Sequence, residues 1–493
     1  MIAALLLVPT AAGIAALAIR PHRARRALLV ASAATHALLT VLCWKHRPAP
    51  ALDGWLLLDA PGMLFLSITS ALFLAASVYA VGYLAREEPG RHRDFQERVL
   101  FTNEPEAVFT GCLLFFLAAM TLVATSQHFG LLWVAVEATT LASAPLIYFH
   151  RHHRSLEATW KYLLICSVGI ALALLGNFFL AVAASGRAGE ARTPLVLSAL
   201  MLHTGELHAP WLRAAFLCFL VGYGTKMGLA PLHAWLPDAH SESPSVVSAL
   251  LSGALLNCAF LGILRAQQVC AAAGMADFGR GLLVIFGLAS MLVAAVFVLG
   301  QKDFKRMLAY SSVEHMGVLA LGVGLGGSGV FGAALHAVNH SLSKAMLFLV
   351  AGNILAAYRT KAIGEVRGVV KVLPASGALW IAGVLAIGGS PPFGPFMSEL
   401  TILQGALAQG RYGIAAAYVA LLVLIFIGMA GAALRMAQGA PPDGVLARAA
   451  ARESPWAIWP PAALGLAVLL LGLWVPRAAS AALHEVATAL GGS

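Results

Sequence analysis

Long apolar stretches separated by short polar connections repeat along almost the whole chain of 493 residues. A helix needs about 20 apolar residues to cross the ~30 Å hydrocarbon core of a bilayer. Isolated strands cannot satisfy their backbone in lipid, so each stretch is expected to be helical. The pattern predicts spans at about 2–19, 27–43, 56–83, 107–126, 129–148, 159–185, 211–233, 244–266, 280–300, 306–326, 328–357, 375–404, 412–436 and 457–476. The predicted fold class is therefore an all-α polytopic membrane protein with about fourteen transmembrane helices.

Composition supports this class, because 60% of the residues are hydrophobic, 11% are charged and the mean hydropathy is +0.83. A soluble globule of ordinary make-up does not have this balance. The first span has no basic residues before it, and Arg20–Arg26 follow it. We therefore expect a mature helix there, not a cleaved signal peptide.

The basic residues are distributed unevenly between the two sides that fourteen spans define. Fourteen spans put both termini on the same side of the membrane. Of the 32 Lys and Arg residues, twenty lie in the connections on the side opposite the termini, nine lie on the side of the termini and three lie within spans. The positive-inside rule then places both termini outside. The net charge of +10 reflects this topology, so nucleic acid is not an expected partner.

Sequence signals for a redox or nucleotide site are lacking. The six cysteines are scattered, without CxxC or Cys/His ligand spacing, so no iron–sulfur or zinc site is expected in this chain. There is also no P-loop and no dinucleotide fingerprint. The energy for any transport would have to come from an ion gradient or from a partner subunit.

Two proline-interrupted spans suggest an internal repeat. Pro231 breaks the seventh span, and Pro391, Pro392 and Pro395 break the twelfth. Spans four to eight and nine to thirteen form two sets of five, the fourth member of each set is discontinuous, and an odd number of spans inverts the second copy. Inverted repeats with discontinuous helices are a transporter architecture with the site near the membrane midplane. The predicted divisions are an N-terminal segment at 1–106, two repeats at 107–266 and 280–436, and a C-terminal helix and tail at 437–493.

Single charges inside apolar spans are the first candidate site residues. Lys226 lies beside the break at Pro231, and Glu137 lies near the middle of the fifth span. A charge at that depth costs about 2.5–3.5 kcal/mol on insertion scales, so the two are expected to be partners. A static ion pair that only fixes helix packing is the alternative.

His336, His340 and Lys344 follow at i, i+4 and i+8 in the eleventh span. They share one helix face and extend over about 12 Å at 1.5 Å per residue. Imidazoles both accept and donate protons near neutral pH, so such a line could relay protons. The alternatives are a metal site, disfavoured because that face has no cysteine or carboxylate, and polar packing satisfied by Asn339 and Ser343.

Glu399 follows the second break and would exchange protons with water. Alternatively, the Glu399 carboxylate would only stabilise the start of the helix after the break, by interacting with the positive end of the helix dipole. Glu314 and His315 in the tenth span are candidate additional relay groups, although His315 could equally be an interior donor. Lys161, near the end of the sixth span, is either a relay group or a snorkelling surface lysine.

Four segments carry a family resemblance, namely TKMGLAPLHAWLPDAHSESPSVVSALLSGALL, DFKRMLAYSSVEHMG, HAVNHSLSKAMLFLVAGN and IGGSPPFGPFMSEL. They resemble the antiporter-like subunits of respiratory complex I and its relatives, most closely component F of hydrogenase-4-type membrane-bound hydrogenases. The resemblance covers nearly the whole chain from the third span onward. It implies a glutamate paired with a lysine on the fifth and seventh spans, central lysines or histidines on the eighth and eleventh, and an acid or lysine on the twelfth. Glu137, Lys226, the face of His336, His340 and Lys344, and Glu399 stand at the matching positions.

One position departs from the family pattern. Relatives in complex I have a lysine on the eighth span where this chain has Asn257. An amide cannot titrate, so a relay there would need water or a neighbouring histidine. This departure fits the hydrogenase branch better than the quinone-linked complexes. The short tail after the last span, without a long lateral helix, argues against the distal subunit of complex I.

The resemblance implies a proton-translocating membrane subunit of a redox-driven complex of the hydrogenase-4 or formate-hydrogenlyase type, in a bacterial inner membrane with periplasmic termini. Nickel–iron and iron–sulfur centres would lie in peripheral hydrogenase and iron–sulfur subunits, with no cofactor or metal in this chain. Other antiporter-like and anchor subunits would be membrane partners, and protons or Na⁺ the transported ions. The alternatives are an Mrp-like cation/proton antiporter, a subunit of an inorganic-carbon uptake complex and a membrane scaffold with vestigial charges.

Overall fold

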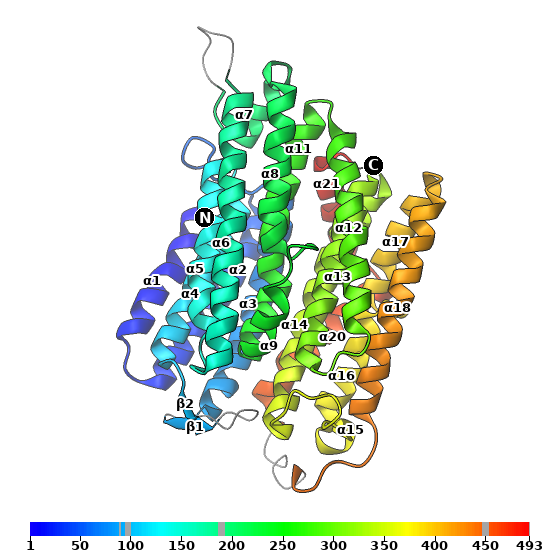
Figure 1. Cartoon of the computed structure of the whole chain (residues 1–493). Coiled ribbons are helices and arrows are strands. Elements are labelled where there is room, and N and C mark those ends of the chain that lie inside the picture. Colours follow the sequence, from blue (N-terminus) through cyan, green and yellow to red (C-terminus); the bar gives the residue numbers. More distant parts are fainter. Residues whose placement is uncertain (88–89, 94–99, 186–192, 446–452, 493) are drawn as a thin grey trace.

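The computed structural model describes residues 1–87, 90–93, 100–185, 193–445 and 453–492, and helices dominate them (Figure 1). The longer helices are α1 (Ile2–Ala18), α2 (His22–Lys45), α3 (Ala60–Arg86), α4 (Glu106–Thr125), α5 (Phe129–Ile147), α6 (His153–Ala183), α8 (Ala209–Met227), α11 (Leu256–Ala272), α12 (Ala276–Val298), α13 (Phe304–Leu325), α14 (Ser328–Tyr358), α16 (Pro374–Ile387), α17 (Gly394–Ala408), α18 (Tyr412–Ala437), α20 (Pro455–Leu473) and α21 (Arg477–Ala489). The short elements are α7 (Leu197–Leu202), η1 (Thr204–Glu206), α9 (Leu236–Glu242), α10 (Ser245–Leu250), η2 (Leu251–Leu255) and α15 (Val369–Val372), with strands β1 (Arg91–Arg93) and β2 (Leu100–Thr102) paired antiparallel.

Eleven helical segments in the described part of the chain are long and apolar enough to cross a membrane. The predicted all-α membrane fold is confirmed. The three other predicted spans correspond to α1, to α8 with the turn through Pro231 that follows it, and to α16 with α17. The count of fourteen and the inverted repeats remain predictions.

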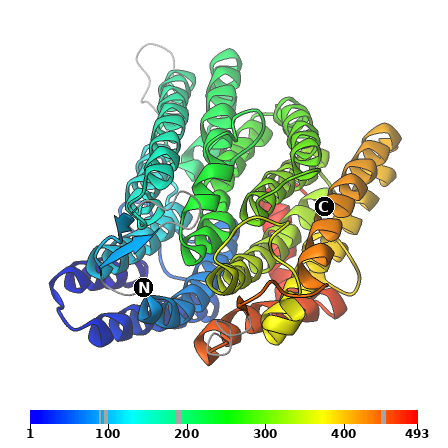
Figure 2. The ribbon, with the colours of Figure 1, turned by 60° about the horizontal axis from the view of Figure 1, so that its bottom comes forward.

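The helices run roughly alongside one another, with α1 and α2 at one side of the molecule and α18 at the other (Figures 1 and 2). Between them lie the segment Ser245–Ala272 and α13, in which all residues of the most apolar 18-residue stretch are buried. In α18 and in α20, 28% of the residues in the corresponding stretch are buried. Lipid-exposed helices keep one apolar face outward, so this contrast marks α11 and α13 as the interior of the bundle.

Both predicted helix breaks are present. The helix α8 ends at Met227, Gly228 has a left-handed φ of 82°, and the chain turns through Pro231 before α9 begins. In the second break, α16 ends at Ile387 and α17 begins at Gly394. Proline lacks a backbone N–H and clashes with a preceding turn, so neither helix can run through.

A π-helical turn, η2, interrupts the segment Ser245–Ala272 and was not expected from the sequence. It ends at Leu255, two residues before Asn257, the position that departs from the family pattern. Such turns widen a helix by one residue and occur frequently at functional sites.

Candidate functional site

Lys226 lies in the last turn of α8 and is fully buried. Its Nζ donates hydrogen bonds to Thr140 Oγ1 at 2.8 Å and to Tyr162 OH at 2.6 Å. The ammonium also lies 4.4 Å from the centre of the Tyr162 ring, where the ring face attracts a cation. Two hydroxyls and one aromatic ring therefore surround this buried amine.

Glu137 on α5 is partly exposed and accepts hydrogen bonds from Thr140 Oγ1 and Ser167 Oγ, each at 3.1 Å. Within the described part of the chain, no ion pair within 4.0 Å joins its carboxylate to Lys226. The structure thus brings the two predicted partners together through Thr140, and they do not form a direct ion pair.

The imidazoles of α13 and α14 form a buried cluster. His315 Nδ1 and His336 Nε2 lie 3.0 Å apart, and His336 Nδ1 is 2.9 Å from Ser398 Oγ. The ring of His340 lies 5.3 Å from that of His315, yet neither nitrogen of His340 has a hydrogen-bond partner among the described residues. Asn339 and Ser343 therefore do not satisfy His340, contrary to the polar-packing alternative.

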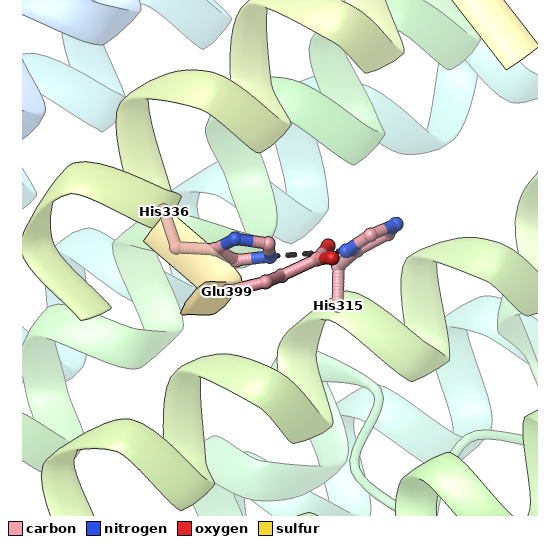
Figure 3. Close-up of side chains that lie close together, drawn as sticks. All are labelled: His315, His336 and Glu399. Carbon is pink, nitrogen blue, oxygen red and sulfur yellow. Dashed lines mark hydrogen bonds between the residues drawn. The ribbon is translucent and has the colours of Figure 1, made fainter. Parts of the chain in front are cut away.

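Glu399 on α17 is 7% exposed and joins the same cluster (Figure 3). One ring nitrogen of His315, one ring nitrogen of His336 and one carboxylate oxygen of Glu399 all lie within 4.8 Å of one another. Because α17 begins at Gly394, Glu399 lies beyond the first helical turn, so the helix-start alternative is wrong.

A cavity of about 380 Å³ adjoins Glu399 at the second helix break. Its walls come from the break itself, from α17 and from α18, and they include Ser390, Leu403, Tyr418 and Phe426. The lining is mostly apolar. Glu399 is the charged group among the residues that line this space.

Lys344, two turns after His336 on α14, is fully buried and donates to the backbone oxygen of Leu308 at 2.6 Å. Glu314 on α13 is 3% exposed, and its Oε2 lies 3.7 Å from His315 Nε2. The predicted face of α14 and the two candidate groups of α13 thus lie together inside the bundle.

Asn257 contacts α14 directly. Its Nδ2 donates to Ser341 Oγ at 2.8 Å and to the oxygen of Gly253, inside η2, at 2.9 Å. Ser341 is the residue after His340. The amide therefore ties the π-helical turn to the helix that bears the histidines.

Lys161 is separate from these groups. Its side chain is 44% exposed and forms ion pairs with Glu157 at 2.6 Å and Asp238 at 3.0 Å. The surface interpretation of Lys161 fits this geometry, and the structure does not bring it to the buried cluster.

Several residues of the site were not singled out by the sequence analysis. Thr140 and Tyr162 hold Lys226, as described above. His240 on α9 is fully buried without a hydrogen-bond partner among the described residues, and it stacks on Phe348 with ring centres 5.0 Å apart. Phe348 is one turn beyond Lys344. The one available signal for His240 was its place in the quoted segment PLHAWLPDAH.

The C-terminal end of α9 is anchored by two lysines. Lys305 donates to the backbone oxygens of Ser241 and Ser243, and Lys361 donates to Ser241 O and to Glu242 Oε1 at 2.8 Å. Cations are favourable at the negative end of a helix. Glu242 lies outside the candidate spans. Burial raises the pKa of its carboxyl, but the charge and hydrogen bond of Lys361, together with the charges of Arg154 and His152, leave that pKa below its usual value.

Comparison with known proteins places this geometry in a family. A profile described as "NADH:quinone oxidoreductase/Mrp antiporter, TM" matches residues 126–425, which include the site from Glu137 to Glu399. The chain belongs to this family. It is an antiporter-like membrane subunit of the complex I and Mrp type.

Individual relatives agree with this assignment. The hydrogenase-4 component F homolog of Methylacidiphilum infernorum is 37% identical over 357 residues, which are 72% of this chain and 73% of that protein. Hydrogenase-4 component B of Escherichia coli is 28% identical over 76% of this chain, which spans about half of that protein, 54%. A chain of respiratory complex I from Thermus thermophilus has a TM-score of 0.80 at 25% identity and covers 100% of both chains. The family resemblance expected from the sequence is confirmed.

Proposed function

We propose that this antiporter-like subunit translocates protons within a redox-driven complex of the hydrogenase-4 or formate-hydrogenlyase type. The observation that carries the proposal is a set of buried titratable groups on membrane helices, extending from Lys226 through α14 to Glu399 at a cavity. Ionisable residues inside a membrane are expensive and typically mark ion pathways. The relation to a hydrogenase-4 component F homolog supports the choice of complex.

In this proposal, protons enter from the cytoplasm beside Lys226 and the break between α8 and α9. They pass along His340 and Lys344 and leave near Glu399. The additional groups Glu314 and His315 adjoin this path, and His240 lies beside Lys344. At Asn257 the path would use the neighbouring imidazoles of α14, because an amide carries no proton.

Coupling would act on the connection between Glu137 and Lys226. A carboxylate near the amine favours its charged form, so moving the carboxylate away favours the neutral amine and releases its proton onward. Moving one charge against 100 mV requires about 2.3 kcal/mol. Redox chemistry in the partner subunits would supply this energy.

The proposed setting is a bacterial inner membrane with both termini on the periplasmic side. The basic-rich connections would then face the cytoplasm, as the positive-inside rule requires. The two five-helix repeats would be residues 107–266 and 280–436. Membrane partners would be further antiporter-like and anchor subunits, and peripheral subunits would hold the nickel–iron and iron–sulfur centres.

A cation/proton antiporter is the second candidate, because the family description covers Mrp antiporters as well. Inverted membrane vesicles that contain the intact complex distinguish the two. Hydrogenase-driven proton uptake that continues without sodium supports the first candidate. Sodium-dependent proton exchange without any redox substrate supports the second and contradicts the first.

The site itself is tested by Lys226→Ala in the same vesicles, with Lys161→Ala as the matched control on the surface. Proton uptake should be lost in Lys226→Ala at normal assembly and normal hydrogenase activity. It should remain in Lys161→Ala. Unchanged pumping in Lys226→Ala would instead support a scaffold whose charges are vestigial.

A further inference from the structure

His315, His336 and Glu399 come from three different helices and converge at one buried point (Figure 3). Their ligand atoms all lie within 4.8 Å of one another. A metal on the histidine face of α14 was not expected from the sequence, because that face has no cysteine or carboxylate. The helix α17 supplies the carboxylate, so that objection no longer holds.

The hydrogen bonds around His336 assign its tautomer. Ser398 Oγ donates to the oxygen of Pro395 at 2.9 Å, so its lone pair is free to accept from His336 Nδ1–H at 2.9 Å. A neutral imidazole with its proton on Nδ1 presents an unprotonated Nε2. That lone pair points toward the space shared with His315 and Glu399.

His315 has the matching arrangement on its other side. Its Nε2 is without a hydrogen-bond partner among the described residues and lies 3.7 Å from Glu314 Oε2. Because His336 Nε2 is unprotonated, His315 Nδ1–H is the donor of the 3.0 Å hydrogen bond between the two rings. A metal ion would displace this proton. With its single proton then on Nε2, facing that carboxylate, His315 would present Nδ1 to the metal. Metal-ligating histidines usually direct the second ring nitrogen at a carboxylate, carbonyl or hydroxyl in this way.

Glu399 completes the set from the cavity side. Its Oε1 is buried and also without a hydrogen-bond partner among the described residues. A buried carboxylate without a partner is costly, and a metal ion would remove that cost. The cavity of about 380 Å³ beside Glu399 offers a route to the site.

We propose that His315 Nδ1, His336 Nε2 and the Glu399 carboxylate form a binding site for a divalent transition metal of the Zn²⁺ class. Two imidazoles and one carboxylate are a known three-ligand set for zinc, with a fourth position open to water. The two nitrogens, 3.0 Å apart, need little movement to bind one ion, and the carboxylate has to close by a further short distance. The ring of His340 lies 5.3 Å from that of His315, beside this site.

A bound ion would occupy groups that the proposed proton path uses, so zinc should inhibit proton uptake. This consequence rests on the proposed function, whereas metal binding does not. Zinc that binds without inhibiting uptake would contradict the proposed path through this cluster and leave the metal site intact.

The test is equilibrium binding of ZnCl₂ to the purified intact complex after treatment with a chelator. We compare wild type, His336→Gln and Glu399→Gln, and use His36→Gln as the matched control. His36 is also buried in a membrane helix, but its two nitrogens contact Ser70 and Thr121, away from this cluster. We expect one zinc per chain in the wild type and in His36→Gln, and affinity weaker by about tenfold or more in the other two.

X-ray absorption at the zinc edge of the loaded wild type should give nitrogen and oxygen ligands at about 2.0–2.2 Å. Sulfur ligands, or wild-type affinity in both Glu399→Gln and His336→Gln, would overturn the proposal. Ser398→Ala keeps all three proposed metal ligands. It provides the test of zinc binding if His336→Gln or Glu399→Gln does not assemble into the complex. It should weaken binding about tenfold or more by releasing the His336 ring, and unchanged affinity in Ser398→Ala would count against the site.

Discussion

The hydroxyl of Thr140 connects Lys226 to Glu137, accepting a hydrogen bond from the lysine at 2.8 Å and donating one to the glutamate at 3.1 Å. A hydroxyl can do both at once because it has one proton and two lone pairs. The bridge lets the carboxylate act on the amine without a direct ion pair. A small displacement of α5 relative to α8 would open or close it.

Replacing Thr140 with valine removes the hydroxyl at nearly constant volume. A hydrogen bond to a charged group contributes about 1.5–3 kcal/mol, so we expect proton uptake by vesicles to fall about tenfold or more, while hydrogenase activity stays normal. Thr140→Ser should retain most of the uptake. Thr139→Val is the control, because among the described residues the Thr139 hydroxyl bonds only to the backbone oxygen of Val136. Normal pumping in Thr140→Val would exclude the bridge from the mechanism.

Gly389 sets the position of the Glu399 carboxylate. A Cβ on Gly389 would lie 2.1 Å from Glu399 Oε2, and its φ of +69° disfavours any L side chain. Gly389→Ala should therefore displace the carboxylate and reduce proton uptake toward the level of Glu399→Gln. Gly410→Ala is the matched control, since its φ is +68° but no atom lies within 4 Å of the added Cβ. If Gly389→Ala and Gly410→Ala reduce proton uptake equally, then backbone strain, and not displacement of the Glu399 carboxylate, causes the loss.

Asn257 is expected to stabilise the fold without carrying protons. Its amide links η2 to Ser341 on α14, so Asn257→Leu leaves buried polar groups unpaired at a cost of about 1–3 kcal/mol. The thermal unfolding midpoint of the purified complex should fall, whereas proton uptake per assembled complex should be retained. Gln268→Leu, on the same helix but bonded to the backbone of Ala489, is the comparison. Loss of uptake at wild-type stability would assign Asn257 a direct part in the path.

Much of the fold was predictable because its physical causes are local. Apolar length indicates a membrane helix, and Pro231 and Pro391 mark breaks because proline cannot continue a helix. Lys226 and Glu399 were recognisable as single charges in apolar surroundings. Spacing on one helix also predicted the shared face of His336 and His340.

The remaining features depend on which helices become neighbours. Thr140 and Tyr162 have ordinary side chains for a membrane helix until α8 brings Lys226 to them. Glu399 meets His336 because α17 packs beside α14, which spacing within either helix cannot reveal. The turn η2 consists of Leu, Ser, Gly and Ala, residues that also occur in regular α-helices, so its composition does not predict a π-helical turn.

The Glu242–Lys361 pair gives the anchor of α9 a predictable pH dependence. The folded-state pKa of Glu242 is lowered, so the pair contributes stability above the unfolded value of about 4.3 and loses it as the pH falls through the lower folded value. Glu242→Gln should reduce the thermal unfolding midpoint of the complex at pH 7. The difference from wild type should shrink below about pH 4, where the wild-type carboxyl also becomes neutral. Glu485→Gln removes a more exposed ion pair, with side chains 37% and 55% exposed, and should change the midpoint little at any pH. A Glu242→Gln difference that stays constant down to pH 3 would show that shape, and not charge, holds this end of α9.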